Sequence, residues 1–371
     1  MVIIGLLGLS VLLAGVGLAL TWTRIGDKAL GEPPARVKAS SNFRDGKFRN
    51  PVPTDNSWGL GKIWQTVKLY RNAGSNVPDS PPPIVRLTRD RLAVSPVSGL
   101  RATWLGHSSV LVEMEGLVIL LDPVFSDRAS PLSFLGPRRF HPVPVSIDDL
   151  PAIDAVVISH DHYDHLDYDT VLALAPKTKT FYLPLGVGAH LEYWGIDRGK
   201  IVEMDWWEET ALGEKTRIVA CPARHFSGRL GFGDRTQWSS FALIGRNHRV
   251  FFSGDTGFMP LFQQIGERFG PFDLTLVKIG AYGLTWPDIH LDPEQAVEVH
   301  RLVGGRLMIP LHWGTFNLSY HPWNEPAERV TAAASKAGAT VVVPRPGQLV
   351  DMDQLPAPDP WWRSVERPIR P

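Results

Sequence analysis

One short stretch of this sequence holds four side chains of the types that bind divalent metals. They lie within six positions and are His160, His162, Asp164 and His165. An apolar run of strand length ends before them and a helix-like run begins at Tyr168, so they occupy a strand-to-helix loop held by rigid neighbours. Residues 160 and 162 point to the same side of an extended backbone. The turn toward the helix brings residues 164 and 165 to a second point nearby. This pattern predicts two adjacent ions with imidazole and carboxylate ligands.

A site for two ions needs further ligands, and three apolar, strand-like runs each lead to one. The candidates are His225, Asp255 and His312. Each lies in a loop-like context after a strand, where binding residues concentrate. Cys221, four residues before His225, is predicted to be a buried apolar side chain rather than a thiolate ligand.

The elements that must position these ligands are short strands in consecutive groups with helices between them. Strand-like runs cover 103–105, 110–112, 117–121, 155–158, 216–220 and 250–252, and helical patterns cover 168–175, 293–302 and 325–337. This order predicts an α/β (α+β) fold in which helices cover sheets, rather than a strict alternation of strand and helix. The globular domain is predicted at 85–354, with a Pro-rich lead-in arm at 23–84 and a Pro-rich tail at 355–371.

The first segment is strongly apolar. Residues 2–22 carry no charged side chain. As a helix this run would measure about 32 Å, close to the roughly 30 Å of a bilayer core. We therefore expect a transmembrane anchor at 1–22, and the Lys and Arg residues that follow it favour a catalytic domain on the cytoplasmic face. A cleaved secretory signal and a peripheral apolar helix are the alternatives.

Composition excludes several classes of protein. The 371 residues include 38 Lys+Arg and 38 Asp+Glu, so the formal net charge is zero. A nucleic-acid partner is therefore not expected, because such binding depends on a basic surface. A single cysteine excludes an intrachain disulfide and a cysteine-rich zinc module. With 44% hydrophobic residues the chain is not globally disordered.

The metal-binding pattern and several longer strings together resemble one family. His-x-His-x-Asp-His followed by a distant His, Asp and His resembles the metallo-β-lactamase superfamily. Further strings resemble the N-acyl-phosphatidylethanolamine-hydrolysing phospholipase D family within it: 103–107 (TWLGH), 121–123 (LDP), 136–140 (GPRRF), 279–282 (IGAY) and 312–316 (HWGTF). The resemblance covers about residues 86–350. It implies an αββα sandwich, here with an N-terminal transmembrane helix, and a di-metal centre along one edge.

The resemblance also implies roles for individual residues. His160, His162 and His225 would hold one Zn²⁺, Asp164, His165 and His312 a second, and Asp255 would bridge the two ions. Asp164, Asp255 and His290 would take part in catalysis. Asp122 and His107 are expected to orient ligands, and Arg138 and Arg139 to guide an anionic head group. The chain departs from the family just before His290. The family has a polar residue at that position, and this chain has Ile289. Iron or manganese are alternatives to zinc, because His/Asp sites accept several metals.

The function that the resemblance implies is a membrane-anchored, zinc-dependent phosphodiesterase of the phospholipase D type. A hydroxide bound to both ions would attack the phosphodiester of N-acyl-phosphatidylethanolamine, a membrane phospholipid, and release N-acylethanolamine and phosphatidic acid. Alternatives are a hydrolase of another phosphodiester or of a sugar-phosphate lactone, and a non-catalytic protein in which zinc only stabilises the fold. The family also implies that a homodimer can form.

Overall fold

Two mixed β-sheets pack face to face in the computed structural model, which describes residues 22–27, 33–57, 59–72, 76–229 and 232–365. The first sheet has seven strands in the order β17-β3-β4-β5-β6-β7-β8. Their bounds are β17 (Leu349–Asp351), β3 (Leu100–Gly106), β4 (Ser109–Met114), β5 (Leu117–Leu121), β6 (Ile153–Val157), β7 (Thr178–Pro184) and β8 (Ile201–Met204). Strands β5 to β8 are parallel and β17 to β5 are antiparallel.

The second sheet has six strands in the order β16-β15-β14-β13-β10-β9. Their bounds are β16 (Gly305–Leu311), β15 (Phe272–Lys278), β14 (Arg249–Phe252), β13 (Ser240–Ile244), β10 (Arg217–Cys221) and β9 (Glu209–Ala211). Strands β14, β15 and β16 are parallel. Two small hairpins lie outside the sheets, β1 (Phe43–Arg44) with β2 (Lys47–Phe48), and β11 (Gly228–Arg229) with β12 (Phe232–Gly233).

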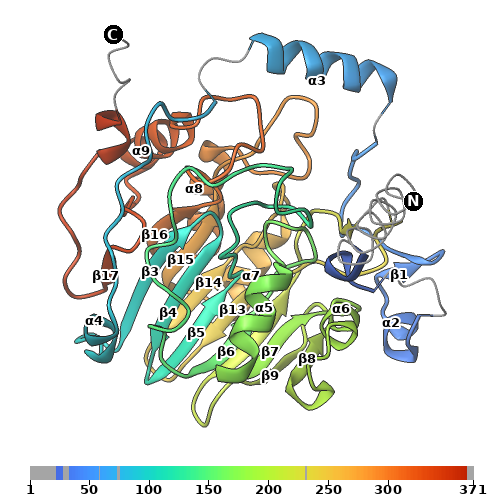
Figure 1. The fold of residues 1–371 in the computed structure, drawn as a ribbon, viewed down its shortest axis with the longest axis horizontal. Coiled ribbons are helices and arrows are strands. Elements are labelled where there is room, and N and C mark those ends of the chain that lie inside the picture. Colours follow the sequence, from blue (N-terminus) through green and yellow to red (C-terminus); the bar gives the residue numbers. More distant parts are fainter. Residues whose placement is uncertain (1–21, 28–32, 58, 73–75, 230–231, 366–371) are drawn as a thin grey trace, which may run out of the picture.

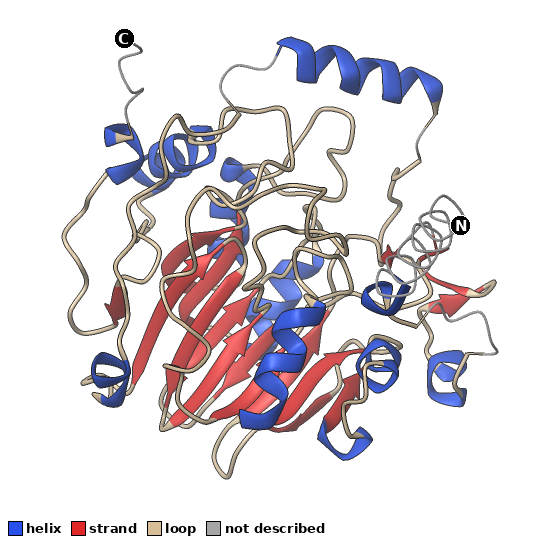
Figure 2. Ribbon diagram, viewed as in Figure 1, coloured by secondary structure: helices blue, strands red, loops and turns tan. Residues whose placement is uncertain are grey.

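Helices cover the outer faces of both sheets, which completes the four-layer αββα sandwich that the family resemblance implies (Figures 1 and 2). The first sheet carries α5 (Tyr168–Leu174) and α6 (Gly188–Tyr193). The second carries α7 (Leu261–Phe269), α8 (Pro293–Leu302) and α9 (Glu325–Ala337). The remaining helices are α2 (Ala35–Ala39), α3 (Leu60–Asn72), α4 (Arg89–Ala93) and the short 3₁₀ turns η1 (Ala175–Lys177), η2 (Arg198–Lys200) and η3 (Trp361–Ser364).

Alternation along the strands explains why both faces of the first sheet are apolar. In β4, Val110 and Val112 belong to the core between the sheets, whereas Leu111 packs into the core beneath the helices. Successive side chains of a strand point to opposite faces, so a strand covered on both sides reads as a continuous apolar run. The sequence also explains where α8 begins. Asp292 and Gln295 form a capping box, and Pro293 occupies the first helical turn.

The predicted localisation as a single-pass membrane protein is wrong. In the part of the chain that the structure describes, no helix is both long and apolar enough to cross a bilayer. The anchor was expected at residues 1–22, of which 1–21 lie outside the described part.

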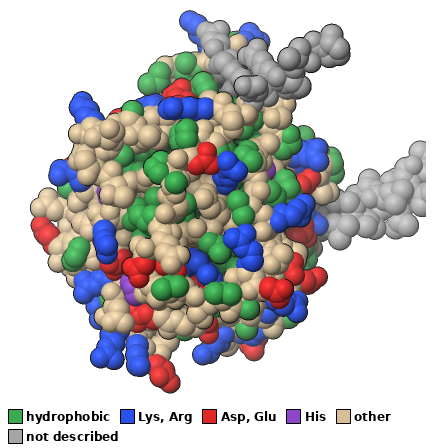
Figure 3. All heavy atoms as spheres, turned by 90° about the vertical axis from the view of Figure 1, so that its left-hand side faces the viewer, with side chains coloured by type: hydrophobic (Ala, Val, Ile, Leu, Met, Phe, Trp, Pro, Cys, Tyr) green, Lys and Arg blue, Asp and Glu red, His purple; other side chains and the backbone are tan. Residues whose placement is uncertain are grey.

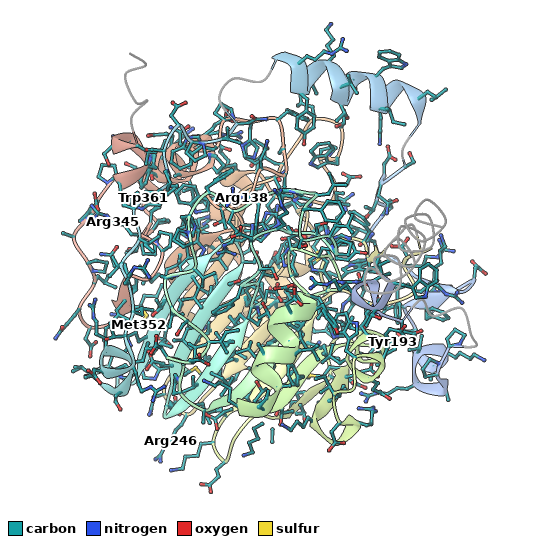
Figure 4. The ribbon with its side chains drawn as sticks, viewed as in Figure 1. Arg138, Tyr193, Arg246, Arg345, Met352 and Trp361 are labelled. Carbon is teal, nitrogen blue, oxygen red and sulfur yellow. The ribbon has the colours of Figure 1, made fainter. Side chains whose placement is uncertain are left out.

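The described part of the Pro-rich tail, residues 355–365, packs against the body of the protein through its tryptophans. Trp361 is buried, and its ring stacks on Trp313 with 5.4 Å between the ring centroids. Figure 4 shows Trp361 and Arg345 on the same side of the molecule. Because Trp313 directly follows the ligand candidate His312, the tail supports the loop that carries that histidine.

Candidate metal centre

The predicted ligands come together at one edge of the sandwich, where strands from both sheets end. His160, His162, Asp164 and His165 lie in the loop between β6 and α5. The others each follow a strand of the second sheet: His225 follows β10, Asp255 follows β14 and His312 follows β16. The structure therefore gathers in one place all seven residues that were proposed as ligands.

Three imidazoles form the first cluster. The Nε2 atom of His160 lies 2.9 Å from Nδ1 of His162, and Nε2 of His225 lies 3.3 Å from the same Nδ1. Asp161 lies between the first two in sequence but points away, where it accepts hydrogen bonds from Gly228 N and Thr236 Oγ1. This alternation is the one expected of extended backbone.

Two carboxylates and two imidazoles form the second cluster. The Nε2 atoms of His165 and His312 each lie 3.4 Å from Oδ2 of Asp164. They lie 3.4 Å and 2.9 Å, respectively, from Oδ2 of Asp255. The same Asp255 oxygen is 3.9 Å from Nε2 of His225 in the first cluster. Asp255 thus lies between the two clusters, where a bridging ligand would be needed.

The donor atoms fit divalent cations. In the described residues, four buried atoms of this cluster have no hydrogen-bond partner: Nε2 of His165, Nδ1 and Nε2 of His312, and Oδ1 of Asp255. Buried polar atoms are rarely left without a partner, so each needs an explanation. Two nitrogens bound to one tetrahedral zinc at 2.0–2.1 Å would be separated by about 3.3 Å, close to the spacing in the first cluster. Nδ1 of His162 lies close to Nε2 of both His160 and His225, and one shared proton cannot make a hydrogen bond to each of them. A cation bound by all three nitrogens would account for their closeness.

The electrostatics of His160 and Asp255 favour the protonation states that metal binding requires, whereas, against the lowering effect of burial, Asp255 and Asp164 hold the pKa of His165 well above its ordinary value. Burial, together with His165 and His162, holds the pKa of His160 well below its ordinary value. Against the raising effect of burial, His312 and His165 hold the pKa of Asp255 well below the usual range. At neutral pH His160 is therefore neutral and Asp255 ionised, as ligands must be.

Asp122 lies behind the ligands and fixes one of them. It is fully buried, and its Oδ2 atom accepts a hydrogen bond from Nδ1 of His165 at 2.6 Å. Its Oδ1 atom accepts a hydrogen bond from the backbone N of Ser159, also at 2.6 Å. The first contact leaves Nε2 of His165 directed toward the carboxylates, so Asp122 has the orienting position that the sequence predicts.

We expect Asp122→Asn to weaken metal binding or activity about 10–100-fold, because one oxygen acceptor becomes an NH₂ donor facing His165 or Ser159. The measurement is metal content together with kcat/KM. Asp127→Asn, on a largely exposed carboxylate paired with Arg138, is the matched control. Unchanged metal affinity and turnover in the Asp122 variant would contradict an orienting role.

Two further histidines lie beside the ligands. Nε2 of His107 donates to Oδ2 of Asp164 at 2.9 Å, and His107 is buried, so it holds a ligand carboxylate rather than facing substrate. His290 is partly exposed in the cavity, and its Nε2 lies 3.8 Å from Oδ2 of Asp255. Positive φ angles at Asp122 (37°), His107 (53°) and His312 (64°) show a backbone held in a sparsely populated region, which is common at functional sites.

The two predicted arginines do not reach the cavity. Arg139 is buried, and its guanidinium donates to the carbonyls of Val124 at 2.9 Å and Leu105 at 3.3 Å. The idea that it guides a head group is therefore wrong, because its donors are used inside the fold. Arg138 pairs with Asp127 at the surface, and neither arginine lines the cavity over the ligands.

The lead-in arm contributes residues that sequence reasoning missed. Asn50 forms a reciprocal pair with the backbone of His225: its Nδ2 donates to the carbonyl at 2.7 Å, and its Oδ1 accepts from the amide N at 2.9 Å. Arg224 donates to Thr54 Oγ1 at 3.0 Å. The arm therefore fastens the loop that carries a ligand, and its local sequence gives no signal of this.

A cavity of about 320 Å³ opens onto the ligands. His162, Asp164, Asp255 and His312 form its floor, and mostly apolar side chains form its walls: Tyr70, Phe226, Trp286, Ile289 and Leu318. Helix α3 closes one side, where Thr66 Oγ1 lies 2.9 Å from Thr285 Oγ1 and Tyr70 packs edge-on against Tyr320. A second cavity of about 480 Å³ adjoins it at His290, which lines both.

Known proteins share both the sequence and the fold of this chain. A beta-lactamase superfamily domain matches residues 118–313. The chain is 42% identical over 298 residues to an N-acyl-phosphatidylethanolamine-hydrolyzing phospholipase D of Caenorhabditis elegans, covering 74% of this chain and 82% of that protein. It is 48% identical over 351 residues to an uncharacterised Mycobacterium tuberculosis protein, covering 90% and 92%.

Solved structures share the same architecture. A metallo hydrolase from Ignicoccus hospitalis aligns over 68% of this chain and 97% of its own, with 23% identity and a TM-score of 0.54. An isothiocyanate hydrolase from Delia radicum gut bacteria aligns over 67% and 98%, with 18% identity and a TM-score of 0.55. These likenesses show the metallo-β-lactamase fold.

Proposed function

This chain belongs to the N-acyl-phosphatidylethanolamine-hydrolysing phospholipase D family of the beta-lactamase superfamily, and from that premise we propose that it cleaves N-acyl-phosphatidylethanolamine to N-acylethanolamine and phosphatidic acid. It is a metallo-hydrolase by fold and family. The proposal concerns the substrate, the metal and the position of the cleaved bond.

Two zinc ions are the cofactor that we propose. His160, His162 and His225 would hold one, Asp164, His165 and His312 the other, and Asp255 would contact both. Bound there, two divalent ions supply a hydroxide nucleophile at neutral pH and offset the charge that develops on a phosphoryl group. The absence of a thiolate ligand also suits iron or manganese, so metal content must be measured on protein purified without added metal.

The protein's own residues would bind and orient the diester. The floor of the cavity holds the phosphate above the ligand carboxylates, and the apolar walls exclude water and accept hydrocarbon. His290 is the neutral imidazole at the junction of the two cavities, because burial together with Lys278 holds its pKa well below the ordinary value. It is placed to donate a hydrogen bond to an oxygen of the substrate.

The observation that carries the proposal is the pair of cavities that meet at His290 beside the ligand cluster. A phosphodiester has two substituents that diverge from one phosphorus atom, and two cavities that share His290 in their lining offer a space for each. A phosphomonoester has only one substituent on its phosphate. The apolar walls favour lipid over a sugar phosphate.

The apolar cavity and the surface charge indicate which partners to expect. The substrate would be a phospholipid, and no nucleic acid is expected. Figure 3 shows Lys and Arg interspersed with Asp and Glu on the face it presents, without a basic stripe. A homodimer stays a prediction.

The test is a product assay by mass spectrometry on the full chain, with N-acyl-phosphatidylethanolamine, unacylated phosphatidylethanolamine and a p-nitrophenyl phosphodiester. We expect N-acylethanolamine and phosphatidic acid from the first lipid. That release should be lost in His162→Ala and kept in His248→Ala, whose histidine pairs with Glu115 away from the site. If the protein cleaves the p-nitrophenyl diester but neither lipid, the proposed lipid substrate is wrong and the proposed phosphodiesterase activity stands. Metal binding with no turnover of any of the three would favour a non-catalytic protein or a carbonyl substrate.

A further inference from the structure

Lys278 is a fully buried lysine at the edge of the metal centre that nothing above explains. It is the last residue of β15, and its side chain is 0% exposed. The Nζ atom lies 2.8 Å from the carbonyl oxygen of Gly280 and 2.8 Å from Nδ1 of His290. Gly280 itself lies against the backbone of a ligand residue, since a Cβ there would meet the His312 carbonyl oxygen at 2.1 Å.

Burying an ammonium group is unfavourable unless it is compensated. Within the described residues, Lys278 has no ion pair with a carboxylate, and its two polar contacts are with a carbonyl oxygen and an imidazole. Burial lowers its pKa to about 8, while Asp255 and Asp164 act in the opposite direction. At neutral pH the group is therefore mostly an ammonium. A well-packed apolar side chain would serve the fold at least as well, which points to a role in the site.

The chemistry of the two partners fixes the proton on His290. An ammonium group has three donors and no acceptor, so Nδ1 of His290 must accept the hydrogen bond. A neutral imidazole that accepts at Nδ1 carries its hydrogen on Nε2. Nε2 is the atom on the Asp255 side of the ring, and His290 lines both cavities. The ring is thereby set as a hydrogen-bond donor toward the reacting diester.

We propose that Lys278 is a positioning residue that holds His290 in its Nε2–H tautomer, so that this N–H stabilises the departing oxygen of the phosphodiester. The inference rests on the proposed phosphodiesterase function and adds a residue to it. An alkoxide is a poor leaving group and depends on such a donor, whereas p-nitrophenolate leaves readily without one. Lys278 therefore acts on the departure of the leaving group and leaves the ligand cluster unchanged.

The competing explanation is that Lys278 only supports the strand end. A structural lysine elsewhere in the chain provides the matched control. Lys200 Nζ donates to the carbonyls of Ala175 at 2.9 Å and Thr178 at 3.0 Å, beside β7 and far from the ligands. Lys200→Met removes a similar set of contacts without touching His290.

The experiment compares Lys278→Met, Lys278→Gln, His290→Ala, Lys278→Met/His290→Ala and Lys200→Met on two diesters. One diester has an alkyl leaving group and the other p-nitrophenolate. We expect both Lys278 variants to lose about 10–100-fold in kcat on the alkyl diester. The loss on the p-nitrophenyl diester should be less than about threefold. The double variant should be no worse than His290→Ala alone, because the two residues act as one unit. Metal content should equal that of the wild type, and Lys200→Met should leave both rates unchanged.

Several results would overturn the proposal. Equal losses on both diesters would assign Lys278 a structural role, as would additive losses in the double variant. Loss of metal in either Lys278 variant would show that Lys278 supports the ligand cluster instead. If Lys278→Met does not fold, the glutamine variant decides by the same ratio of rates, because its side chain is polar but one bond shorter than that of lysine and does not bring its donor to Nδ1. Failure of the lipid assignment is separately visible, because the wild type would still cleave the generic diesters.

Discussion

Asp255→Asn is expected to lower kcat/KM about 10³-fold and to reduce bound metal. The Asp255 carboxylate lies between the two clusters, with its Oδ2 atom 2.9 Å from His312 and 3.9 Å from His225. Asparagine has nearly the same shape but no charge to offset two cations. Metal ions contribute several kcal/mol to such transition states, and a loss of about 4 kcal/mol corresponds to roughly 10³-fold in rate.

The measurement for this prediction pairs elemental analysis of metal content with kcat/KM on one diester. Asp148→Asn, which changes an exposed aspartate in the loop before β6, controls for the loss of a charge. If Asp255→Asn kept two metals per chain and lost less than tenfold in kcat/KM, the bridging assignment would be wrong.

Removal of the metals is expected to lower Tm by roughly 5–10 °C. Ions bind the native cluster and not the unfolded chain. Each ion at 100 times its Kd would add about 2.7 kcal/mol, or about 5 kcal/mol for two. In a chain of 371 residues 1 kcal/mol shifts Tm by roughly 1–2 °C. The unpartnered atoms of His165, His312 and Asp255 would then stay buried without ligands, which adds to the loss.

Calorimetry with and without a chelator tests this, followed by readdition of zinc. The expected outcome is a reversible fall in Tm that is much smaller in Asp255→Asn, because that variant has less metal to lose. An unchanged Tm after complete removal of metal, verified by elemental analysis, would contradict the account of the cluster.

The ligands were predictable from the sequence because they are local or follow strands. His160 to His165 lie in one loop, and His225, Asp255 and His312 each come just after an apolar run, which the structure confirms as β10, β14 and β16. Helices α8 and α9 begin and end where their patterns predict, since Asp292 caps the first and Gly338 ends the second in a left-handed conformation.

Residues that act across long distances in sequence were not predictable. Asn50 contacts His225 from 175 positions away, and Arg139 turned out to be buried among carbonyls. Lys278 follows an apolar run, and a lysine at a strand end is ordinarily exposed. Its burial depends on how β15 meets the loop that carries His290.

The N-terminal arm is attached to the loop that carries His225, so it is part of the site. The sequence predicts a Pro-rich lead-in arm at 23–84, and in the structure residues 50–54 of this arm hold the His225 loop and α3 forms one side of the cavity. The predicted boundary at residue 84 is therefore not a boundary of the site. A variant trimmed to the core domain would lose parts of the site, so assays should use the full chain.

The most direct test of the central claim is hydrolysis of N-acyl-phosphatidylethanolamine in ¹⁸O-labelled water, with both products weighed by mass spectrometry. Attack at phosphorus with loss of the N-acylethanolamine oxygen predicts one ¹⁸O in phosphatidic acid and none in N-acylethanolamine. Label in N-acylethanolamine, or diacylglycerol in place of phosphatidic acid, would contradict the phospholipase D reaction proposed for this site.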